Sequence, residues 1–525
     1  MDVIVQFNQP VSAAHHLKVK SKGGSLKREL GVVKGGAYSL PAGALAALAA
    51  DPDVAYISPD RKVQGALDYA APTVGADIAR LNGWNGSGVR VAIVDSGIQT
   101  SDAGDLQYPG SAASRVIYSE SFLGNNVTID QYGHGNHVAG IVAGNGDNSL
   151  GANVTRTFYG IATNPELINL RALDANGAGS DSTVIAAIER AIQLRGQYNI
   201  RVVNLSLGRP VFESYVLDPL CQAVEAAWKK GLVVVVAAGN QGRNNSLGTA
   251  GYATIASPGN DPYVITVGAM KTKSTASRGD DEIASYSSKG PSLLDHVVKP
   301  DLVAPGNRIV SLVAQDSALV TTYPDNRILQ SYFKSSGPKQ YSDKYFRLSG
   351  SSMAAAMVSG TAALMLQKNP SLTPDQIKAR LMRTATKGFP SYSVATDPVT
   401  GQTYTSQYDV FTVGAGYLDA WAALNDTTLA TGTALSPKAA YDAASGTVSL
   451  VFDSGVVWGT GVVWGTGVVW GTGVVWGTGV VWGTGVVWGT GGAPSGTGVV
   501  WGTGVVWGTG QVASEATVIA IHGEN

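Results

Sequence analysis

Val91-Ala92-Ile93-Val94-Asp95-Ser96-Gly97 is the stretch that decides the fold, because a short apolar run ends there on an acid and a glycine. Two more Gly-flanked stretches follow it: Gly133-His134-Gly135-Asn136-His137-Val138-Ala139-Gly140 and Gly350-Ser351-Ser352-Met353-Ala354-Ala355. Glycine lets a backbone approach a ligand closely. The three stretches therefore supply an acid, a base and a nucleophile, in that order along the chain.

Strand-like and helix-like segments alternate from residue 73 to 425. Short β-branched runs occur at Val89 to Val94, Leu167 to Leu173, Val202 to Leu207, Leu232 to Ala238 and Tyr263 to Val267. Helical patterns such as Ser182 to Arg195 and Leu217 to Lys230 fall between strands. This alternation predicts an α/β fold with a mainly parallel sheet, helices on both faces and a site at the carboxyl ends of the strands. Asp95 lies at such an end.

Composition excludes several classes of partner. The 525 residues carry 37 Lys and Arg against 38 Asp and Glu, so no net field favours nucleic acid or an acidic surface. No apolar run approaches the ~20 residues of a membrane helix, so we expect no transmembrane segment. The single cysteine, Cys221, cannot form an intrachain disulfide and is expected to be a buried structural thiol.

Residues 1–68 form a separate N-terminal segment in the pattern. Val3 to Phe7 is predicted as a strand, Ala42 to Ala50 as a helix and Val54 to Ile57 as a strand that returns after the turn at Asp51-Pro52-Asp53. The segment is expected to be a small α+β domain.

Residues 426–525 change in character. After a short strand at Thr447 to Phe452, the hexapeptide Gly-Val-Val-Trp-Gly-Thr recurs and places tryptophans at Trp458, Trp464, Trp470, Trp476, Trp482, Trp488, Trp501 and Trp507. A period of six puts every Trp on one face of an extended chain and also suits a solenoid. A β-rich repeat module and a weakly ordered, adhesive tail both remain open.

Attack on a peptide carbonyl needs an oxygen nucleophile, a base and a group that holds the base in the right tautomer, roles that Ser352, His134 and Asp95 fit. The motifs and their order resemble those of the subtilase family of serine proteases. The resemblance implies that the nucleophile is Ser352 and not Ser351, at the start of the helix Ala354 to Gln367. It implies also that His134 is the base and His137 its neighbour.

A fourth motif, Ala238-Gly239-Asn240-Gln241-Gly242, follows a predicted strand. Gly-Asn in that position is commonly an ordinary turn. The resemblance implies that the Asn240 side chain, with the backbone N–H of Ser352, donates hydrogen bonds to the oxyanion of the reaction.

The same resemblance implies a role for residues 1–68 as an inhibitory propeptide that assists folding, with its tail in the substrate cleft until it is cut. The cut is expected within Val63 to Pro72. The chain opens on Met1-Asp2 without a signal peptide, so it is either cytoplasmic or recorded after signal removal. A propeptide suits an exported protease, and we favour the second and expect a secreted protein.

Substrate binding is expected at segments matched to the family. The resemblance implies that an extended polypeptide pairs with Ser206-Leu207-Gly208 and with Gly177-Ala178-Gly179. The first of these, with Ala237-Ala238-Gly239, should wall the pocket for the residue before the scissile bond, P1. These walls carry no acid to pair with Lys or Arg, which predicts an apolar or broad P1 preference.

Catalysis needs no cofactor, but a structural calcium ion is a further expectation from the resemblance. The loop Asn145-Gly146-Asp147-Asn148 resembles a calcium loop, and Asp105 could add a carboxylate. Oxygen-rich loops are also ordinary turns.

The chain departs from the family pattern in several places. The family usually has Thr, Pro, His and Thr where this chain has Ser351, Ala356, Met357 and Asn136. Changes of this kind can alter a rate through small shifts of geometry. Gln315 to Phe346 is unusually long and Tyr-rich, and it forms either a lid or wall of the cleft or an inert surface loop.

Three functions follow from these patterns. The first is a secreted serine endopeptidase made as a zymogen. The second is a catalytically silent fold that serves as an adhesion platform through its Trp repeats, against which the intact tetrad argues. The third is a cytoplasmic or self-processing protease whose only substrate is its own propeptide.

Overall fold

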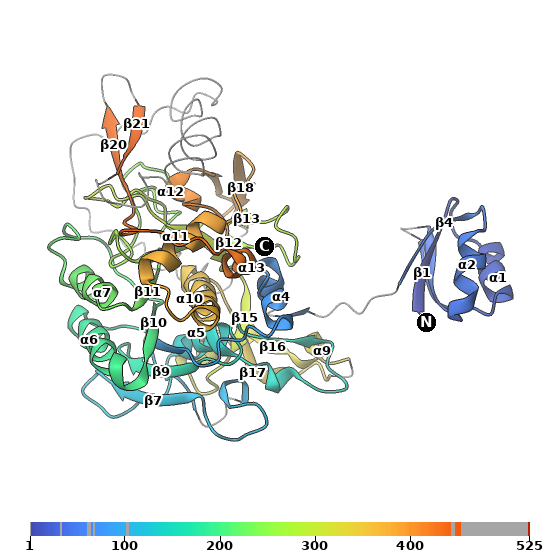
Figure 1. Cartoon of the computed structure of the whole chain (residues 1–525), viewed down its shortest axis with the longest axis horizontal. Helices are drawn as coiled ribbons and strands as arrows, with labels where there is room; N and C mark the ends of the chain where they lie inside the picture. The colour runs from blue at the N-terminus through green and yellow to red at the C-terminus, as the bar shows by residue number, and fades with distance from the viewer. Residues whose placement is uncertain are drawn as a thin grey trace. The chain divides into compact units, whose positions relative to one another are not determined.

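The computed structural model describes residues 2–31, 34–59, 65–66, 69–100, 104–335, 337–397, 400–442, 447–452 and 523–524 (Figure 1). The chain splits into two compact units, Met1–Gln64 and Gly65–Asn525, which are described separately. The predicted Trp-repeat module or tail lies outside the described residues.

The smaller unit is a four-stranded antiparallel sheet with helices. Its elements are β1 (Asp2–Phe7), α1 (Ala13–Ser21), β2 (Ser25–Leu30), β3 (Gly35–Ser39), α2 (Leu45–Ala49) and β4 (Val54–Pro59), in the strand order β2-β3-β1-β4. The two predicted strands are β1 and β4, which pair directly. Val3, Val5 and Phe7 alternate inward from β1 onto Val19 and Leu48, as expected for a sheet with one covered face.

The larger unit is built on an eight-stranded sheet. The strand order is β13-β12-β11-β10-β6-β9-β7, with β14 also paired to β12, and only β13 runs antiparallel. The strands are β6 (Arg90–Asp95), β7 (Val116–Ser121), β9 (Glu166–Arg171), β10 (Ile200–Leu205), β11 (Val233–Ala237), β12 (Ile265–Lys271), β13 (Glu282–Ile283) and β14 (Leu302–Pro305). The β-branched runs of the sequence are these strands, and β11 is buried along its whole length, as parallel strands covered on both faces must be.

Helices cover both faces of this sheet, as predicted. One layer contains α5 (His134–Ala143) and α10 (Ser351–Lys368), and the other contains α6 (Asp181–Tyr198) and α7 (Pro219–Lys229). Almost every residue of α10 is buried, because this Ala- and Met-rich helix has core on every side. Side-chain oxygens of Ser180 and Asp218 cap the starts of α6 and α7.

The strand order reverses at β6, which lies between β10 and β9. Ligand sites of open α/β sheets form at such a reversal, beyond the carboxyl ends of the strands. Asp95 is the last residue of β6, and α5 and α10 begin nearby on the same side of the sheet. The fold thus brings the three sequence motifs to one edge.

The Tyr-rich stretch between residues 315 and 346 is neither a bare loop nor wholly at the surface. It contains α8 (Ala318–Thr322), β16 (Arg327–Leu329), α9 (Gln330–Phe333) and most of β17 (Tyr341–Leu348), and β17 pairs with β16 and with β15 (Ile309–Leu312). Phe333 and Tyr345 are buried against Phe158. The stretch therefore adds a small sheet to the core.

The remaining elements complete the larger unit: β5 (Gly65–Ala66), α3 (Ala70–Thr73), α4 (Ala76–Leu81), β8 (Arg156–Thr157), α11 (Pro374–Thr384), β18 (Tyr392–Thr396), β19 (Thr403–Gln407), α12 (Val410–Val413), α13 (Ala420–Asn425), β20 (Lys438–Asp442) and β21 (Thr447–Val451). The pair β5 and β8 is parallel, and β5 lies within the range where a propeptide cut is predicted.

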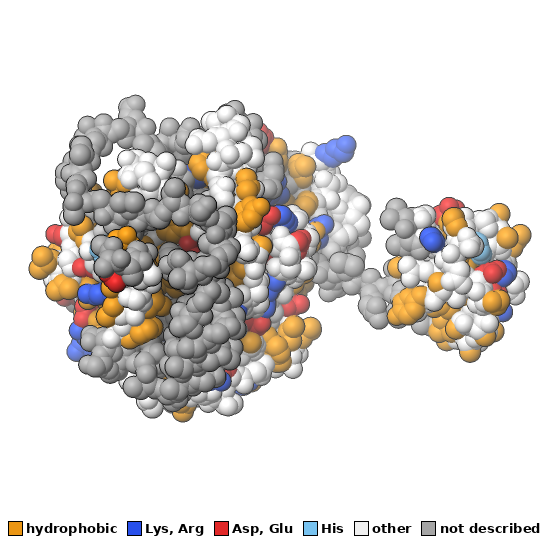
Figure 2. Space-filling model, turned by 90° about the horizontal axis from the view of Figure 1, so that it is seen from above, with side chains coloured by type: hydrophobic (Ala, Val, Ile, Leu, Met, Phe, Trp, Pro, Cys, Tyr) orange, Lys and Arg blue, Asp and Glu red, His pale blue; other side chains and the backbone are white. Residues whose placement is uncertain are grey.

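The cysteine, the helix lengths and the surface charge bear on the predicted class of protein. Cys221 is buried, as expected, and burial raises the pKa of its thiol. No helix in the described part of the chain is long and apolar enough to cross a membrane. Basic and acidic side chains lie interspersed on the face shown in Figure 2.

Candidate active site

Asp95 and His134 are joined directly. His134 Nδ1 lies 2.8 Å from Asp95 Oδ1, and the Asp95 side chain is 1% exposed against 17% for His134. The backbone N–H of Ser96 also donates to Asp95 Oδ1, at 2.8 Å. A buried carboxylate on Nδ1 fixes the imidazole tautomer in which Nε2 is the free base.

The helix that carries His134 starts in a tightly held loop. Gly133 has φ +108°, a conformation that favours glycine. The buried carboxylate of Asp130 accepts hydrogen bonds from the N–H groups of Gly133 and Asn136, both at 2.7 Å, and from Ser96 Oγ at 2.8 Å. Asp130 thus caps α5 and links it to the residue after Asp95. This role could not be predicted from the sequence, because Asp130 stands three residues before the N-cap Gly133 and not at the cap itself.

The two histidines of α5 differ in electrostatics. Burial opposes charging of His134, but the Asp95 charge and hydrogen bond outweigh it and raise the pKa of the imidazole. Burial lowers the pKa of His137 to about 3. His137 stays neutral, and its Nε2 donates to the carbonyls of Ile309 and Phe346, at 3.0 and 3.2 Å. These bonds of His137 join α5 to β15 and β17. Of the two histidines, His134 is therefore the one available to act as a base.

Ser351 and Asn240 join the start of α10 to the loop after β11. Asn240 Oδ1 accepts from the backbone N–H of Ser351 at 2.9 Å and from Ser351 Oγ at 3.1 Å. Ser351 Oγ in turn accepts from the N–H of Gly239 at 3.0 Å. With its oxygen occupied, Asn240 has its amide Nδ2 left to donate. Ser351 is fully buried in this bridge.

Ser352 lies in the first turn of α10 and is half-buried. Its Oγ donates to the carbonyl of Ser206 at 3.1 Å, and Ser206 Oγ donates to the carbonyl of Ser352 at 2.9 Å. Within the described residues, no hydrogen bond joins Ser352 Oγ to His134. Hydroxyl and imidazole commonly align only when substrate is bound.

The predicted substrate segments flank this serine. Ser206 to Gly208 leave the end of β10, and Gly208 is exposed. Ala256 and Ser257 connect the two expected pocket walls, because Ala256 N donates to Ala238 O at 2.9 Å and Arg209 N donates to Ser257 O at 3.0 Å. The two walls therefore lie on either side of one short segment.

The second predicted substrate segment lies beside the loop that precedes His134. Gly177 has φ +73°, and a Cβ on it would come within 2.4 Å of the Tyr132 ring. Ala178 and Gly179 are exposed. The segment is exposed, but its turn is closed by Asp174, whose N–H donates to Ala178 O at 2.8 Å and whose Oδ1 accepts from Ala178 N at 3.0 Å.

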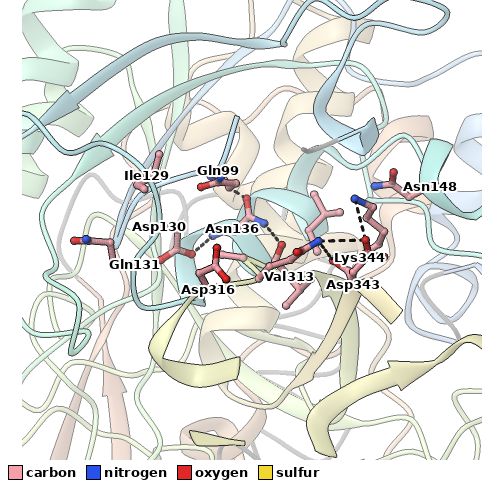
Figure 3. Close-up of a pocket in the computed structure, with 13 residues that line it drawn as sticks. Gln99, Ile129, Asp130, Gln131, Asn136, Asn148, Val313, Asp316, Asp343 and Lys344 are labelled. Atoms are coloured by element: carbon pink, nitrogen blue, oxygen red, sulfur yellow. Dashed lines mark hydrogen bonds and ion pairs between the residues drawn. The ribbon is translucent and has the colours of Figure 1, made fainter. Parts of the chain in front are cut away.

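A polar pocket of about 210 Å³ lies beside the start of α5 (Figure 3). Asp130 and Asn136 form part of its lining, and Asp316, Asp343 and Lys344 come from the Tyr-rich stretch and its flank. Asn136 holds this region together, because its Nδ2 donates to Val313 O at 2.8 Å and its Oδ1 accepts from Gln99 N at 3.2 Å. The other departures in the motifs, Ala356 and Met357, are fully buried in α10.

The four residues of the expected calcium site do come together. Asp105 Oδ1 accepts from Asn148 N at 2.7 Å and its Oδ2 from Tyr345 Oη at 2.9 Å. Asn145 and Asp147 bond each other in both directions at 3.0 Å. Burial raises the pKa of Asp105 to about 7.

A buried, positively charged side chain already donates hydrogen bonds to backbone carbonyl groups around this loop. The guanidinium of Arg115 is fully buried and donates to the carbonyls of Asp105 and Ala143, at 2.7 and 2.6 Å. A calcium ion needs six to eight free oxygen ligands. The residues as placed do not fit calcium, because both carboxylate oxygens of Asp105 and one side-chain oxygen each of Asn145 and Asp147 accept protein hydrogen bonds. A positive charge also already lies beside Asp105.

Comparison with known proteins agrees with this geometry. The model of the subtilase family matches residues 86–416. Serine protease AprX of Bacillus subtilis is 36% identical over 333 residues, which span 61% of this chain and 67% of that protein. Subtilisin E of the same species is 33% identical over 390 residues, 73% of this chain and 84% of that protein. Subtilisin DY of Bacillus licheniformis is 34% identical over 320 residues, 61% of this chain and 92% of that protein. This chain therefore belongs to the subtilase family and is a subtilisin-like serine peptidase.

Proposed function

We propose that the chain is a serine endopeptidase in which Ser352 is the nucleophile, His134 the general base and Asp95 the group that orients it. The observation that carries the proposal is the 2.8 Å bond between His134 Nδ1 and Asp95 Oδ1 at the carboxyl end of β6. It leaves Nε2 as the acceptor for a proton from Ser352.

The reaction proceeds through an acyl-enzyme. Ser352 Oγ turns from the Ser206 carbonyl, attacks the substrate carbonyl carbon and passes its proton to His134 Nε2. The oxyanion accepts hydrogen bonds from Asn240 Nδ2 and from the free N–H of Ser352 in the first turn of α10. His134 then protonates the leaving amine, and water, activated by the same base, releases the acyl group.

The substrate is an extended polypeptide that enters between Ser206-Leu207-Gly208 and Gly177-Ala178-Gly179. Exposure of Gly208 and Gly179 supports pairing on both sides. The P1 pocket between Ser206-Leu207-Gly208 and Ala238-Gly239 has no ionisable side chain on these walls. A broad or apolar P1 preference follows.

The smaller unit, residues 1–68 as predicted from the pattern, is proposed as a propeptide that inhibits the enzyme until it is cut. A compact unit that ends near Gln64 supports this division. An inhibitor attached to the enzyme suits a peptidase that becomes active after export, so secretion is part of the proposal.

Labelling of the full chain with a fluorophosphonate probe tests the nucleophile. We expect wild type and Ser351→Thr to be labelled at Ser352, and Ser352→Ala to be inert. A label on Ser351 would show that the nucleophile is misassigned. Sequencing of the new N-terminus tests the propeptide, with a cut expected between Val63 and Pro72.

Turnover separates the competing functions. Hydrolysis of casein by wild type, lost in Ser352→Ala, supports the endopeptidase. A chain that cuts only itself, with no multiple turnover on added peptides, would be a self-processing protease. No cleavage and no labelling would leave the silent platform.

A further inference from the structure

A short segment beyond the Trp repeats is seated in the larger unit. Gly523 and Glu524 are described, although the Trp-repeat stretch before them is not. Glu524 is only 7% exposed, which is unusual for a charged residue. Its burial has to be explained by what surrounds it.

The Glu524 carboxylate has a set of positively charged and hydrogen-bonding partners. Oε1 accepts from Arg243 Nη2 at 2.8 Å, from the N–H of Ser285 at 3.0 Å and from the Ser285 hydroxyl. Lys271 Nζ lies 3.4 Å from Oε2. The side chains of Arg243 and Lys271 are themselves 10% and 5% exposed.

Charges in this cluster balance only when Glu524 is present. Arg243 also pairs with Asp397 at 2.7 Å. Lys271 pairs with Glu282 at 3.1 Å, and Glu282 is bound to Lys273 as well. Three cations thus face two anions from the body of the unit, and Glu524 supplies the third. Without it, Arg243 would keep only Asp397, and Lys271 would keep only Glu282, which is shared with Lys273. The two buried cations would thus lose part of their compensation.

The backbone of the tail is recognised as well. Glu524 N donates to Asn307 Oδ1 and Asn307 Nδ2 donates to Glu524 O, both at 2.8 Å. Gly523 has φ +75°, and a Cβ there would lie 2.5 Å from both Arg308 Cγ and Ser349 Oγ. Another residue at 523 would be strained at this φ and would displace these side chains. The position therefore favours glycine before Glu524.

We propose that the larger unit contains a carboxylate-binding site for a Gly-Glu segment and that its occupant is Gly523-Glu524 of the same chain. The site goes beyond peptide hydrolysis and does not depend on it. It attaches the chain after Phe452 to the unit at a second point. It adjoins the nucleophile loop, because Ser349 Oγ also accepts from Arg308 N at 2.8 Å.

Amide hydrogen exchange on the full chain tests the docking, in a Ser352→Ala background that removes self-cleavage. Gly523→Ala should eject the tail and speed exchange of the Ser285 amide by about 10- to 100-fold, the ratio expected when a bond to a charged group is lost. Gly388→Ala is the matched control, since a Cβ at Gly388 has nothing within 4 Å. Protection of Ser285 that is unchanged in Gly523→Ala would overturn the proposal.

A peptide added in trans tests the site itself. Fluorescein-labelled Ile-His-Gly-Glu-Asn should bind saturably to the Gly523→Ala chain and much less to the chain with its own tail in place. The peptide with Gln for Glu should bind about 10- to 100-fold more weakly. Equal binding of the two peptides, or no binding of either, would show that the site does not recognise a carboxylate.

Discussion

Replacing Ser351 by alanine should slow catalysis without touching the reacting atoms. The Ser351 hydroxyl accepts from Gly239 N at 3.0 Å and donates to Asn240 Oδ1 at 3.1 Å. Ser351→Ala removes both bonds and leaves the Asn240 side chain with the backbone N–H of Ser351 at 2.9 Å as its remaining partner. The alanine variant therefore frees Asn240 to turn away from the oxyanion.

The size of the effect follows from these bonds. Complete loss of an oxyanion donor costs about 2.7–4 kcal/mol in transition-state stabilisation. Because Ser351→Ala removes one of the two bonds that orient the donor, we expect a loss of about 1–2 kcal/mol, or about 5- to 30-fold in kcat. KM should change little, since the oxyanion exists only in the transition state.

Steady-state hydrolysis of a chromogenic peptide measures this effect. Ser351→Thr is the control and should keep nearly full activity, because it retains the hydroxyl. Asn240→Ala should lose about 10²–10³ in kcat. The double variant should be no slower than Asn240→Ala, because Ser351 acts through Asn240. Additive losses in the double variant, or a threonine variant as slow as alanine, would refute this reasoning.

Three further outcomes are expected. Because the pKa of His134 is raised and the base must be neutral, kcat/KM should rise with pH through a midpoint above the ordinary ~6.5, and Asp95→Asn should lower both the midpoint and the rate in a pH profile. Asp301 is buried between two lysine ammonium groups at 2.8 and 3.2 Å, so Asp301→Asn in the inactive Ser352→Ala chain should cost about 3–5 kcal/mol in urea unfolding. Because Asp105 is satisfied by protein donors, a chelator should leave the thermal unfolding midpoint unchanged; a fall reversed by added calcium would contradict the fit described for this loop.

The main sheet could be predicted because its strands are buried on both faces and appear as uninterrupted apolar runs, as in Val233 to Ala237. The N-terminal unit was only half predicted. Helix α1 buries His15 and Val19 alone, and most of β2 is exposed, so neither element has a strong hydrophobic period. Their folding depends on the sheet that they join.

At the site, the motifs identified the pair of Asp95 and His134 but not how the Ser352 side chain turns. The bond from Ser352 Oγ to the Ser206 carbonyl is a rotamer choice that no sequence pattern encodes. Asp130 was missed because its cap spans a loop rather than a regular spacing. The calcium expectation rested on oxygen-bearing residues, and their spacing could not show that Arg115 reaches the same carbonyls.

Attachment of the chain at Glu524 as well as at β21 limits how far the intervening part can extend from the enzyme. About 70 residues fixed at one end could span at most ~240 Å, whereas the same length fixed at both ends on one body reaches only about half as far. Any contact that the tryptophans make would thus be kept within roughly 120 Å of the two points at which the chain is attached.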